Sequence, residues 1–423
     1  MTIDVKTHAL RSFRLSLAAA AVAAALGLQT TPDGRVAWPT AIAQEAVRGE
    51  VGRPLQAARD LIKGKRYSEA LAKLREADAV PNLTASEKFL IEQMRASAAL
   101  SAGDNGQAIK AIQALLASGR LPESQQAQYA GSLASLYYRE KDYREAAQWA
   151  GKALRSNPSD GAMRSLQISS YYLAGDLASA SREALEDVQA AEKAGRTPPE
   201  DRLQLLANIA SKTGDRAAYV AGIERLVAYY PKKEYWVDLL RRLESKPGFS
   251  NRLTLDLYRL RAATKTLDSA NEIVEMAQLA LQQKQAGEAK QVLDSAFASG
   301  LLGKGTEAER QKRLLALASE RVADAPNQLK QAEAEALAAA DGSDLVNVGF
   351  AYSGLGQHEK GIALMQQGIA KGKLKRADEA NLHLGIAYLR AGQRAKAQQA
   401  FKSVGGTDGT ADLARLWMRV STV

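Results

Sequence analysis

Apolar residues recur three or four positions apart along most of the chain, and residues 127–160 show this pattern in its clearest form. One face of a first predicted helix carries Leu133, Ala134 and Tyr137. After a short turn at Lys141 and Asp142, a second apolar stripe follows and ends before Pro158; it consists of Tyr143, Ala146, Ala150 and Ala153. The stretch therefore predicts a helical hairpin, in which small alanines let the two helices approach closely and tyrosines fill the space around them.

The same offsets recur along the chain, so a tandem array is expected. Five predicted hairpins follow one another from about residue 51 to Pro231. Residues 234–268 keep two amphipathic helices, but Lys246-Pro247-Gly248 makes the turn between them longer. The pattern then resumes, with a weaker hairpin over about 304–340 whose turn is placed at Pro326 and Asn327, and two clear repeats after it. Residues 410–420 predict a last amphipathic helix that caps the final repeat.

This pattern of Leu, small, Tyr, Ala and Pro positions resembles the tetratricopeptide repeat (TPR), which is about 34 residues long. The resemblance implies an all-α fold, a right-handed superhelical α-solenoid built of TPR-like helical hairpins. We divide the chain into a signal peptide (1–43), an N-terminal array (44–268, with the diverged hairpin at 234–268), a C-terminal array (269–405) and a capping helix (406–423).

The first 43 residues differ from the repeats. Three basic residues, Lys6, Arg11 and Arg14, precede a short apolar run over residues 15–28, and Ala41-Ile42-Ala43 offers a small-x-small cleavage sequence. The apolar run is too short to span a bilayer comfortably. A Sec-type signal peptide cut after Ala43 is the interpretation adopted, which predicts a periplasmic protein without stable membrane insertion. An uncleaved anchor and an alanine-rich helix of a cytoplasmic protein are the alternatives.

Composition adds a positive charge and removes cysteine chemistry. The formal net charge is +10 over 423 residues, and there is no cysteine. A basic surface attracts nucleic acid, anionic lipid or acidic wall polymers. Because the Lys and Arg residues are interspersed with Glu and Asp, a solvated helical surface is favoured and nucleic acid is not an expected partner. Disulfides, thiolate zinc sites and cysteine nucleophiles are excluded.

No combination of residues in the sequence predicts an enzyme. The three histidines, His8, His358 and His383, lie far apart in the repeat order, so neither a metal site nor a cofactor is expected. The sequence GLLGKGT at 300–306 follows a predicted helix and lacks the spacing of a phosphate-binding loop. The chain is therefore expected to act by binding.

In such an array the first helix of each hairpin lines a groove, and we place the candidate partner-binding residues there. The middle repeats present a polar, mildly basic lining with two aromatic rings: Tyr138, Arg139, Tyr172, Asn208 and Lys212. Such a lining suits an extended peptide, because backbone amides need hydrogen-bond partners and side chains can pack on tyrosine. Surface polar residues with no ligand are the alternative.

The C-terminal groove positions are apolar instead, namely Val346, Phe350, Leu382 and Ile386. Exposed together, they would form a binding site for a partner helix. Burial by packing between repeats, or by the terminal helix carrying Trp417, is the alternative.

A sharper local resemblance covers Leu226 to Trp236, where YPKKEYW is similar to a segment of periplasmic TPR proteins that accompany TonB-type energy-transducing systems in Gram-negative bacteria. This resemblance implies an envelope scaffold, with TonB-type complex components as partners. The function predicted from the sequence is a non-enzymatic periplasmic scaffold that binds extended or helical segments of envelope proteins. The alternative is a structural envelope protein that holds acidic glycan or cell-wall polymer on its basic surface.

Overall fold

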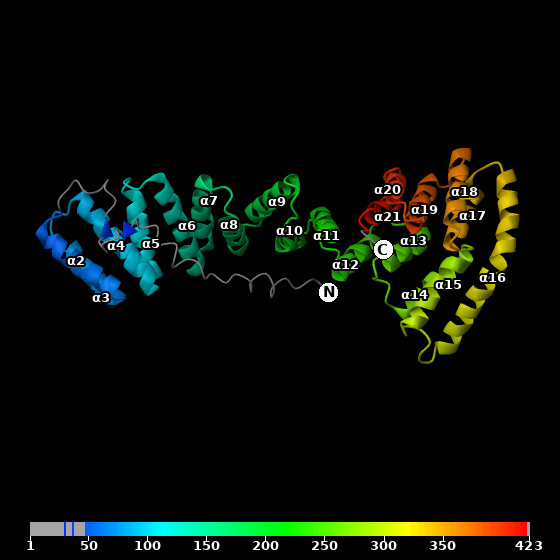
Figure 1. Ribbon diagram of the computed structural model, residues 1–423, viewed down its shortest axis with the longest axis horizontal. Helices are drawn as coiled ribbons and strands as arrows, with labels where there is room; N and C mark the ends of the chain where they lie inside the picture. Colours follow the sequence, from blue (N-terminus) through cyan, green and yellow to red (C-terminus); the bar gives the residue numbers. More distant parts are fainter. Residues whose placement is uncertain (1–28, 31–35, 38–46, 421–423) are drawn as a thin grey trace. The chain divides into compact units, whose positions relative to one another are not determined.

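The computed structural model describes residues 29–30, 36–37 and 47–420 (Figure 1). In this part of the chain the regular structure is helical, apart from a two-residue antiparallel pair of β1 (Gln29–Thr30) with β2 (Val36–Ala37). The predicted all-α solenoid of helical hairpins is confirmed. The predicted signal segment lies almost entirely outside the described residues, as does its cleavage position after Ala43. No helix within residues 47–420 has the length and apolarity that crossing a bilayer requires.

The described chain forms two compact units, which divide between Asp215 and Arg216. The helices of the first unit are α2 (Gly49–Lys63), α3 (Tyr67–Asp78), α4 (Ala85–Ala102), α5 (Asn105–Ala117), α6 (Glu123–Arg139), α7 (Tyr143–Ser156), α8 (Gly161–Leu173), α9 (Leu177–Lys193) and α10 (Glu200–Thr213). Successive helices pack side by side along this unit (Figure 1). The clearest sequence hairpin corresponds to α6 and α7.

A shared backbone device reverses the chain inside these hairpins. One residue of each turn adopts a left-handed conformation, with φ of 63–81° at Gly103, Lys141 and Gly175. The next residue is an aspartate whose carboxylate accepts a hydrogen bond from the backbone N–H three residues later, which caps the second helix at Asp104, Asp142 and Asp176. The corresponding residues of the second unit are Gln285, Gln357 and Gln393, which make no such cap.

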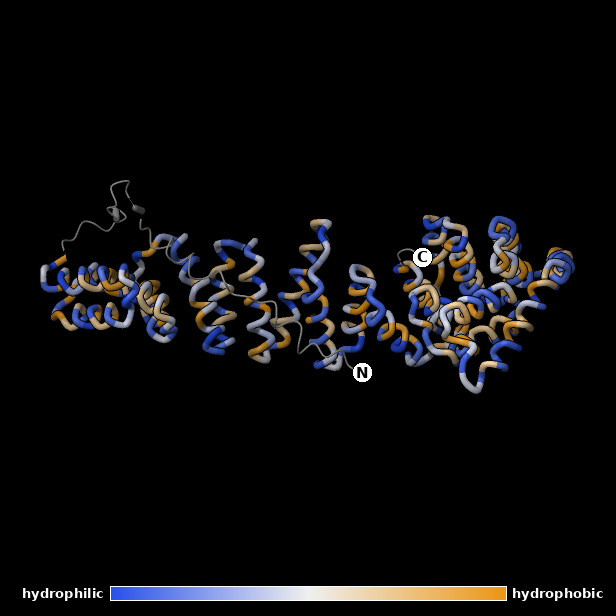
Figure 2. The backbone as a smooth tube through the Cα atoms, turned by 60° about the horizontal axis from the view of Figure 1, so that its bottom comes forward, coloured by the Kyte–Doolittle hydropathy of each residue, from blue (hydrophilic) through white to orange (hydrophobic). Residues whose placement is uncertain are grey.

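Alanine and leucine build the core between the helices of the first unit. In the hairpin of α6 and α7, Ala134 packs in one cluster with Ala146 and Ala150, whereas Leu133 joins the core of the preceding helices. In Figure 2, hydrophobic and hydrophilic residues alternate around each helix, as the sequence periodicity predicts. Burial of the apolar stripe, and not helix propensity alone, stabilises helices of this length.

A charged contact fixes the beginning of the first unit. Thr84 and Glu87 form a reciprocal capping box at the start of α4. The Arg48 side chain donates to Glu87 through Nε at 2.9 Å and through Nη2 at 2.7 Å. These hydrogen bonds lower the pKa of Glu87 to about 2, and those from Arg48 have the largest effect.

The helices of the second unit are α11 (Arg216–Tyr229), α12 (Lys233–Glu244), the 3₁₀ turn η1 (Asn251–Leu253), α13 (Thr254–Ala263), α14 (Ala270–Gln282), α15 (Ala286–Ala298), α16 (Ala308–Ala338), α17 (Ser343–Gly354), α18 (His358–Lys371), α19 (Ala377–Arg390), α20 (Arg394–Lys402) and α21 (Thr410–Trp417). The diverged pair predicted at 234–268 is present as α12 and α13, which belong to this unit. The sequence-based division at 268, drawn from repeat register, therefore differs from the division into compact units. The fifth predicted hairpin also spans that division, since α10 ends one unit and α11 begins the other.

The weak hairpin predicted over about 304–340 is wrong, because this stretch is one continuous helix. α16 runs for 31 residues with Pro326 inside it. Its buried positions lie seven or four residues apart on both sides of the proline: Gln311, Ala318, Ala325, Leu329 and Ala336. Ala318 packs with α14 and α15, and Leu329 packs with α17. Neither Pro326 nor Asn327 has the positive φ found at the chain reversals. The helix thus tolerates one missing backbone donor because both halves are held by packing.

The C-terminal helix packs on the last helices of its own unit and also contacts earlier ones. α21 lies against α19 and α20, where the rings of Phe401 and Trp417 stack with centroids 6.3 Å apart. α21 also contacts α13 (Figure 1). Ser250 N donates to Asp408 O at 2.9 Å, and Lys246 pairs with Asp412 at 2.6 Å. The last helices of this unit therefore return to its first ones.

Candidate functional site

The predicted groove residues of the first unit lie on α6, α8 and α10, each the first helix of its hairpin. Arg139 and Lys212 are exposed, whereas Tyr138, Tyr172 and Asn208 are partly buried. Helices α6 and α8 contact each other directly. The arrangement places these five side chains on neighbouring first helices, as the repeat register requires.

Three of the five residues form a contact cluster between α8 and α10. The Tyr172 hydroxyl donates to Asn208 Oδ1 at 2.7 Å. Lys212 Nζ lies 4.4 Å from the centroid of the Tyr172 ring, within the range of a cation–π interaction. The phenol thus orients the Asn208 amide and is covered on one face by a cation. We call Tyr172, Asn208 and Lys212 the tyrosine cluster.

The remaining two residues of this prediction are arranged differently. Tyr138 packs edge-on against Tyr143, with ring centroids 5.4 Å apart and planes at 68°. This contact joins the end of α6 to the start of α7, so the Tyr138 ring also stabilises its own hairpin. Arg139 is exposed at the end of α6. The tyrosine cluster is therefore the best-formed part of the predicted groove.

The apolar groove predicted in the C-terminal array is buried. Relative exposures are 3% for Val346, 2% for Phe350, 0% for Leu382 and 2% for Ile386. The expectation that these four side chains form an exposed partner site is wrong, and the alternative of burial holds. The Phe350 ring stacks on His383 at 4.5 Å between centroids. The guanidiniums of Arg259 and Arg390 lie 4.8 and 4.9 Å from the same ring.

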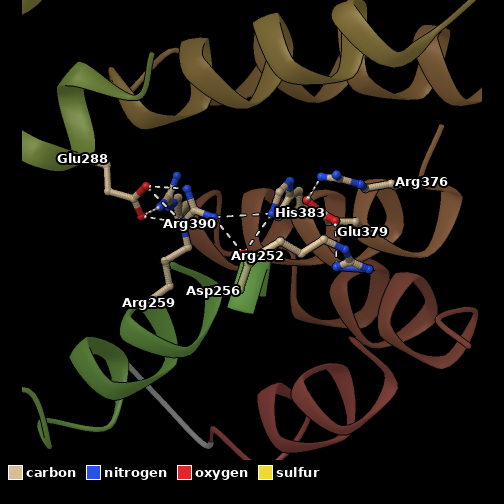
Figure 3. Close-up of polar contacts among 8 residues, drawn as sticks. All are labelled: Arg252, Asp256, Arg259, Glu288, Arg376, Glu379, His383 and Arg390. Atoms are coloured by element: carbon tan, nitrogen blue, oxygen red, sulfur yellow. Dashed lines mark hydrogen bonds and ion pairs between the residues drawn. The ribbon is translucent and has the colours of Figure 1, made fainter. Parts of the chain in front are cut away.

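His383, Arg259 and Arg390, which contact the Phe350 ring, belong to a network of charged residues. Figure 3 shows this network. Arg259 on α13 donates to both carboxylate oxygens of Glu288 on α15, at 2.8–3.0 Å, and to Asp256 Oδ1 at 2.7 Å. Arg390 on α19 donates to Glu288 Oε1 at 2.8 Å. His383 Nε2 lies 2.8 Å from Asp256 Oδ1. We call these five residues, Asp256, Arg259, Glu288, His383 and Arg390, the ionic core.

Electrostatics keep the acidic members of the ionic core charged. Burial alone would raise the pKa of Asp256, but its interactions with His383 and Arg259 outweigh burial and hold that pKa below its ordinary value. The pKa of Glu288 is likewise lowered, because Arg259 and Arg390 outweigh its burial. Burial lowers the pKa of Arg390 despite its contact with Glu288. Since Asp256 is a carboxylate, His383 Nε2 is the donor in their hydrogen bond.

Sequence reasoning missed the ionic core and the Glu379 carboxylate next to it. Residues 255–260, LDLYRL, are all buried, so Asp256 and Arg259 lie in a helix without a solvent face. Glu379 lies one helical turn before His383, a ligand-type spacing that the sequence analysis overlooked. No sequence signal pairs Arg259 or Arg390 with Glu288, because those contacts join residues 29 and 102 positions apart.

The ionic core is not well suited to a metal ion. Ligand atoms of Asp256, Glu379 and His383 lie within 4.8 Å of one another. Each carboxylate among them already faces a guanidinium: Asp256 that of Arg259, and Glu379 those of Arg252 at 3.2 Å and Arg376 at 3.7 Å. A divalent cation would have to displace these positive charges, so the cluster is an ion-pair network.

Two cavities of about 680 Å³ each open on opposite ends of the ionic core within the second unit. The first, between α13, α16, α17 and α19, has walls of mixed charge that include Arg252, Arg376, Asp344 and Glu379. The second includes Arg259, Glu288, Arg390 and Arg394. The mixed cavity is close to neutral, whereas the other has a surplus of positive charge.

No protein-family model matches the chain, and no curated protein matches it. Solved structures of helical-repeat proteins do. A chain of the Naa15/Naa10 complex bound to HypK-THB matches with 14% identity and a TM-score of 0.31. The match includes 83% of this chain and 57% of that chain. This chain thus spans a little over half the length of that relative.

In two further solved structures the match extends over nearly the whole of the other protein. One is a tetratricopeptide repeat protein from Parabacteroides merdae, with 13% identity, a TM-score of 0.22, and coverage of 70% of this chain and 99% of that chain. The other is yeast Tom70, with 11% identity, a TM-score of 0.23, and coverage of 87% and 94%. Similarity at this level carries no argument about partners, and the fold rests on the hairpins themselves.

Proposed function

We propose that this protein is a non-enzymatic periplasmic scaffold that captures extended segments of other proteins along α6, α8 and α10. The tyrosine cluster supports this proposal most directly. Asn208 Oδ1 accepts the hydrogen bond from the Tyr172 hydroxyl, so the Asn208 Nδ2 amide can donate to the carbonyl of a bound peptide. The Tyr172 ring and Lys212 add an aromatic surface and a cation beside it. An extended chain has both backbone acceptors and side chains, so it can use all three groups.

Peptide selection followed by a binding measurement tests this site. Peptides selected by display on the chain beginning at Gln44 are synthesised with capped ends, and their affinity is measured by fluorescence anisotropy. We expect Tyr172→Ala to weaken binding about tenfold, because an aromatic anchor at the centre of an interface typically contributes this much. Helix content by circular dichroism should not change.

The matched control is Tyr67→Ala, which removes a partly buried tyrosine from α3, the second helix of its hairpin. Affinity should stay within about twofold of the unaltered protein. Equal affinities for the unaltered protein and Tyr172→Ala would remove the tyrosine cluster from the binding site. Binding of acidic polymer that disappears between low and physiological salt would favour the alternative envelope-polymer function.

We further propose export through residues 1–43 and a role beside a TonB-type transport complex. The basic residues, short apolar run and Ala41-Ile42-Ala43 support export, and the Leu226–Trp236 resemblance supports the TonB-type role. Tyr235 and Trp236 are buried on α12, so this segment also has a packing role.

Export predicts that residues 1–43 direct a reporter to the periplasm. Fused to an alkaline phosphatase that lacks its own signal, they should give an active enzyme, and the processed full chain should begin at Gln44. An inactive, unprocessed fusion would contradict export. Cross-linking in the native host with high-salt washing then tests the TonB-type role, which fails if no energy-transducing or outer-membrane transport component is recovered.

A further inference from the structure

The second cavity of the second unit combines a cationic wall with an apolar one. Its cationic side comprises Arg390 at the end of α19 and Arg394 at the start of α20, and His358 at the start of α18 also lines the space. Its apolar side is formed by Met276, Val292, Ile386, Leu389 and Trp417. The space is about 680 Å³ and is open to solvent, so a short stretch of an elongated ligand can enter it. We call it the basic cavity.

The basic cavity has more cations than its one carboxylate neutralises. Charges alternate through the ionic core from Asp256 to Arg259, Glu288 and finally Arg390. Both oxygens of Glu288 already accept hydrogen bonds from Arg259, and one also accepts from Arg390. Arg394, one turn beyond Arg390, is exposed and pairs with no carboxylate among residues 47–420. A surplus positive charge therefore faces the cavity.

Donors without partners line the same space. Trp417 Nε1 is buried and has no hydrogen-bond partner in the described chain, and neither has Arg390 Nη1. Arg390 Nη1 and the unpaired Gln285 Oε1 lie 3.9 and 3.7 Å from the position of a Cβ on Gly354. The Arg394 guanidinium is exposed, and neither it nor the buried indole N–H of Trp417 has a side-chain hydrogen-bond partner among residues 47–420. Both are suited to an acceptor that carries negative charge.

We propose that the basic cavity binds an acidic, amphipathic peptide segment of a partner protein. An Asp or Glu carboxylate would lie between Arg394 and the Trp417 indole N–H, and a neighbouring apolar side chain would pack on Val292 and Leu389, which are only partly buried. A peptide fits better than a bare anion because the apolar wall is as much a part of the cavity as the cationic one. This site is separate in residues and chemistry from the tyrosine cluster.

A direct test uses a fluorescent, end-capped peptide in which Leu and Asp alternate, with its Leu and Lys counterpart as the probe control. We expect the acidic peptide to bind the full chain and the basic one not to bind. Arg394→Glu should weaken the acidic peptide at least about tenfold, since it replaces a charge-assisted hydrogen bond with repulsion. Lys402→Glu makes the same charge change on α20 outside the cavity and should alter affinity by less than about twofold.

Intrinsic fluorescence locates the bound peptide. An unlabelled acidic peptide should change the tryptophan emission of the protein, and Trp417→Phe should abolish that change. Tyr172→Ala should bind the acidic peptide normally, so failure of this site and failure of the tyrosine cluster are distinguishable. The proposal is overturned if the acidic peptide does not bind, if Arg394→Glu and Lys402→Glu weaken it equally, or if millimolar inorganic phosphate displaces it fully.

Discussion

An Arg259→Ala variant is expected to lose about 3–5 kcal/mol of unfolding free energy, because it leaves two buried carboxylates without their shared cation. Asp256 and Glu288 are 2% and 5% exposed, and Arg259 makes four hydrogen bonds to them. The loss is measured by urea unfolding of the full chain. Hydrogen exchange should show the loss of protection in α13, α15 and α19, the helices that the ionic core joins.

Arg261→Ala is the matched control for this prediction, since it removes an arginine from the same helix. Arg261 pairs with Glu272 at 2.7 Å, and both side chains are partly exposed. Its loss should cost at most about 1 kcal/mol, as for other solvent-accessible pairs. Equal losses for the two variants would show that the ionic core contributes no more than a surface ion pair.

The effect of Arg259→Ala should also depend on pH. The folded pKa values of Asp256 and Glu288 lie below their ordinary values of 3.8 and 4.5. Such groups add stability that is fully present above the ordinary pKa and is lost as the pH falls toward the folded pKa. The difference between the unaltered protein and Arg259→Ala should therefore be constant above about pH 5.5 and shrink in acid. A difference that grows on acidification would contradict this electrostatic account.

A Gly349→Ala variant is expected to lose about 1–3 kcal/mol, as overpacked cores do. A Cβ on Gly349 of α17 would lie 2.6 Å from the carbonyl oxygen of Gly361 on α18, and a Cβ on Gly361 would lie 2.5 Å from that of Gly349. Both obstacles are backbone atoms, so side-chain rotation cannot relieve them. The two helices would have to separate, which thermal unfolding of the full chain detects.

Gly161→Ala is the control for added volume alone. Gly161 begins α8, and a Cβ there meets nothing within 4 Å. Alanine should leave stability unchanged or raise it by up to about 1 kcal/mol, because it restricts the unfolded chain. If Gly349→Ala proves as harmless as Gly161→Ala, α17 and α18 do not depend on close backbone approach.

The amino-acid sequence by itself determined the helices of the first unit and their pairing into hairpins. Local pattern carries this information, because Leu133, Ala134 and Ala146 lie on faces fixed by helical periodicity and turns such as Lys141-Asp142 encode chain reversal within a few residues. It also placed Tyr172, Asn208 and Lys212 on the first helices of their hairpins.

The tertiary structure decided what local pattern does not contain. Pro326 resembled a turn in the sequence, but α16 continues through it. The buried face of α16 packs on α14 and α15 before the proline and on α17 after it. Phe350 and Leu382 resembled an open groove, but the second unit closes over them and pairs charges from α13, α15 and α19 around Phe350. The physical reason is range: helix periodicity depends on residues three or four apart, whereas burial and ion pairing depend on which distant helices meet.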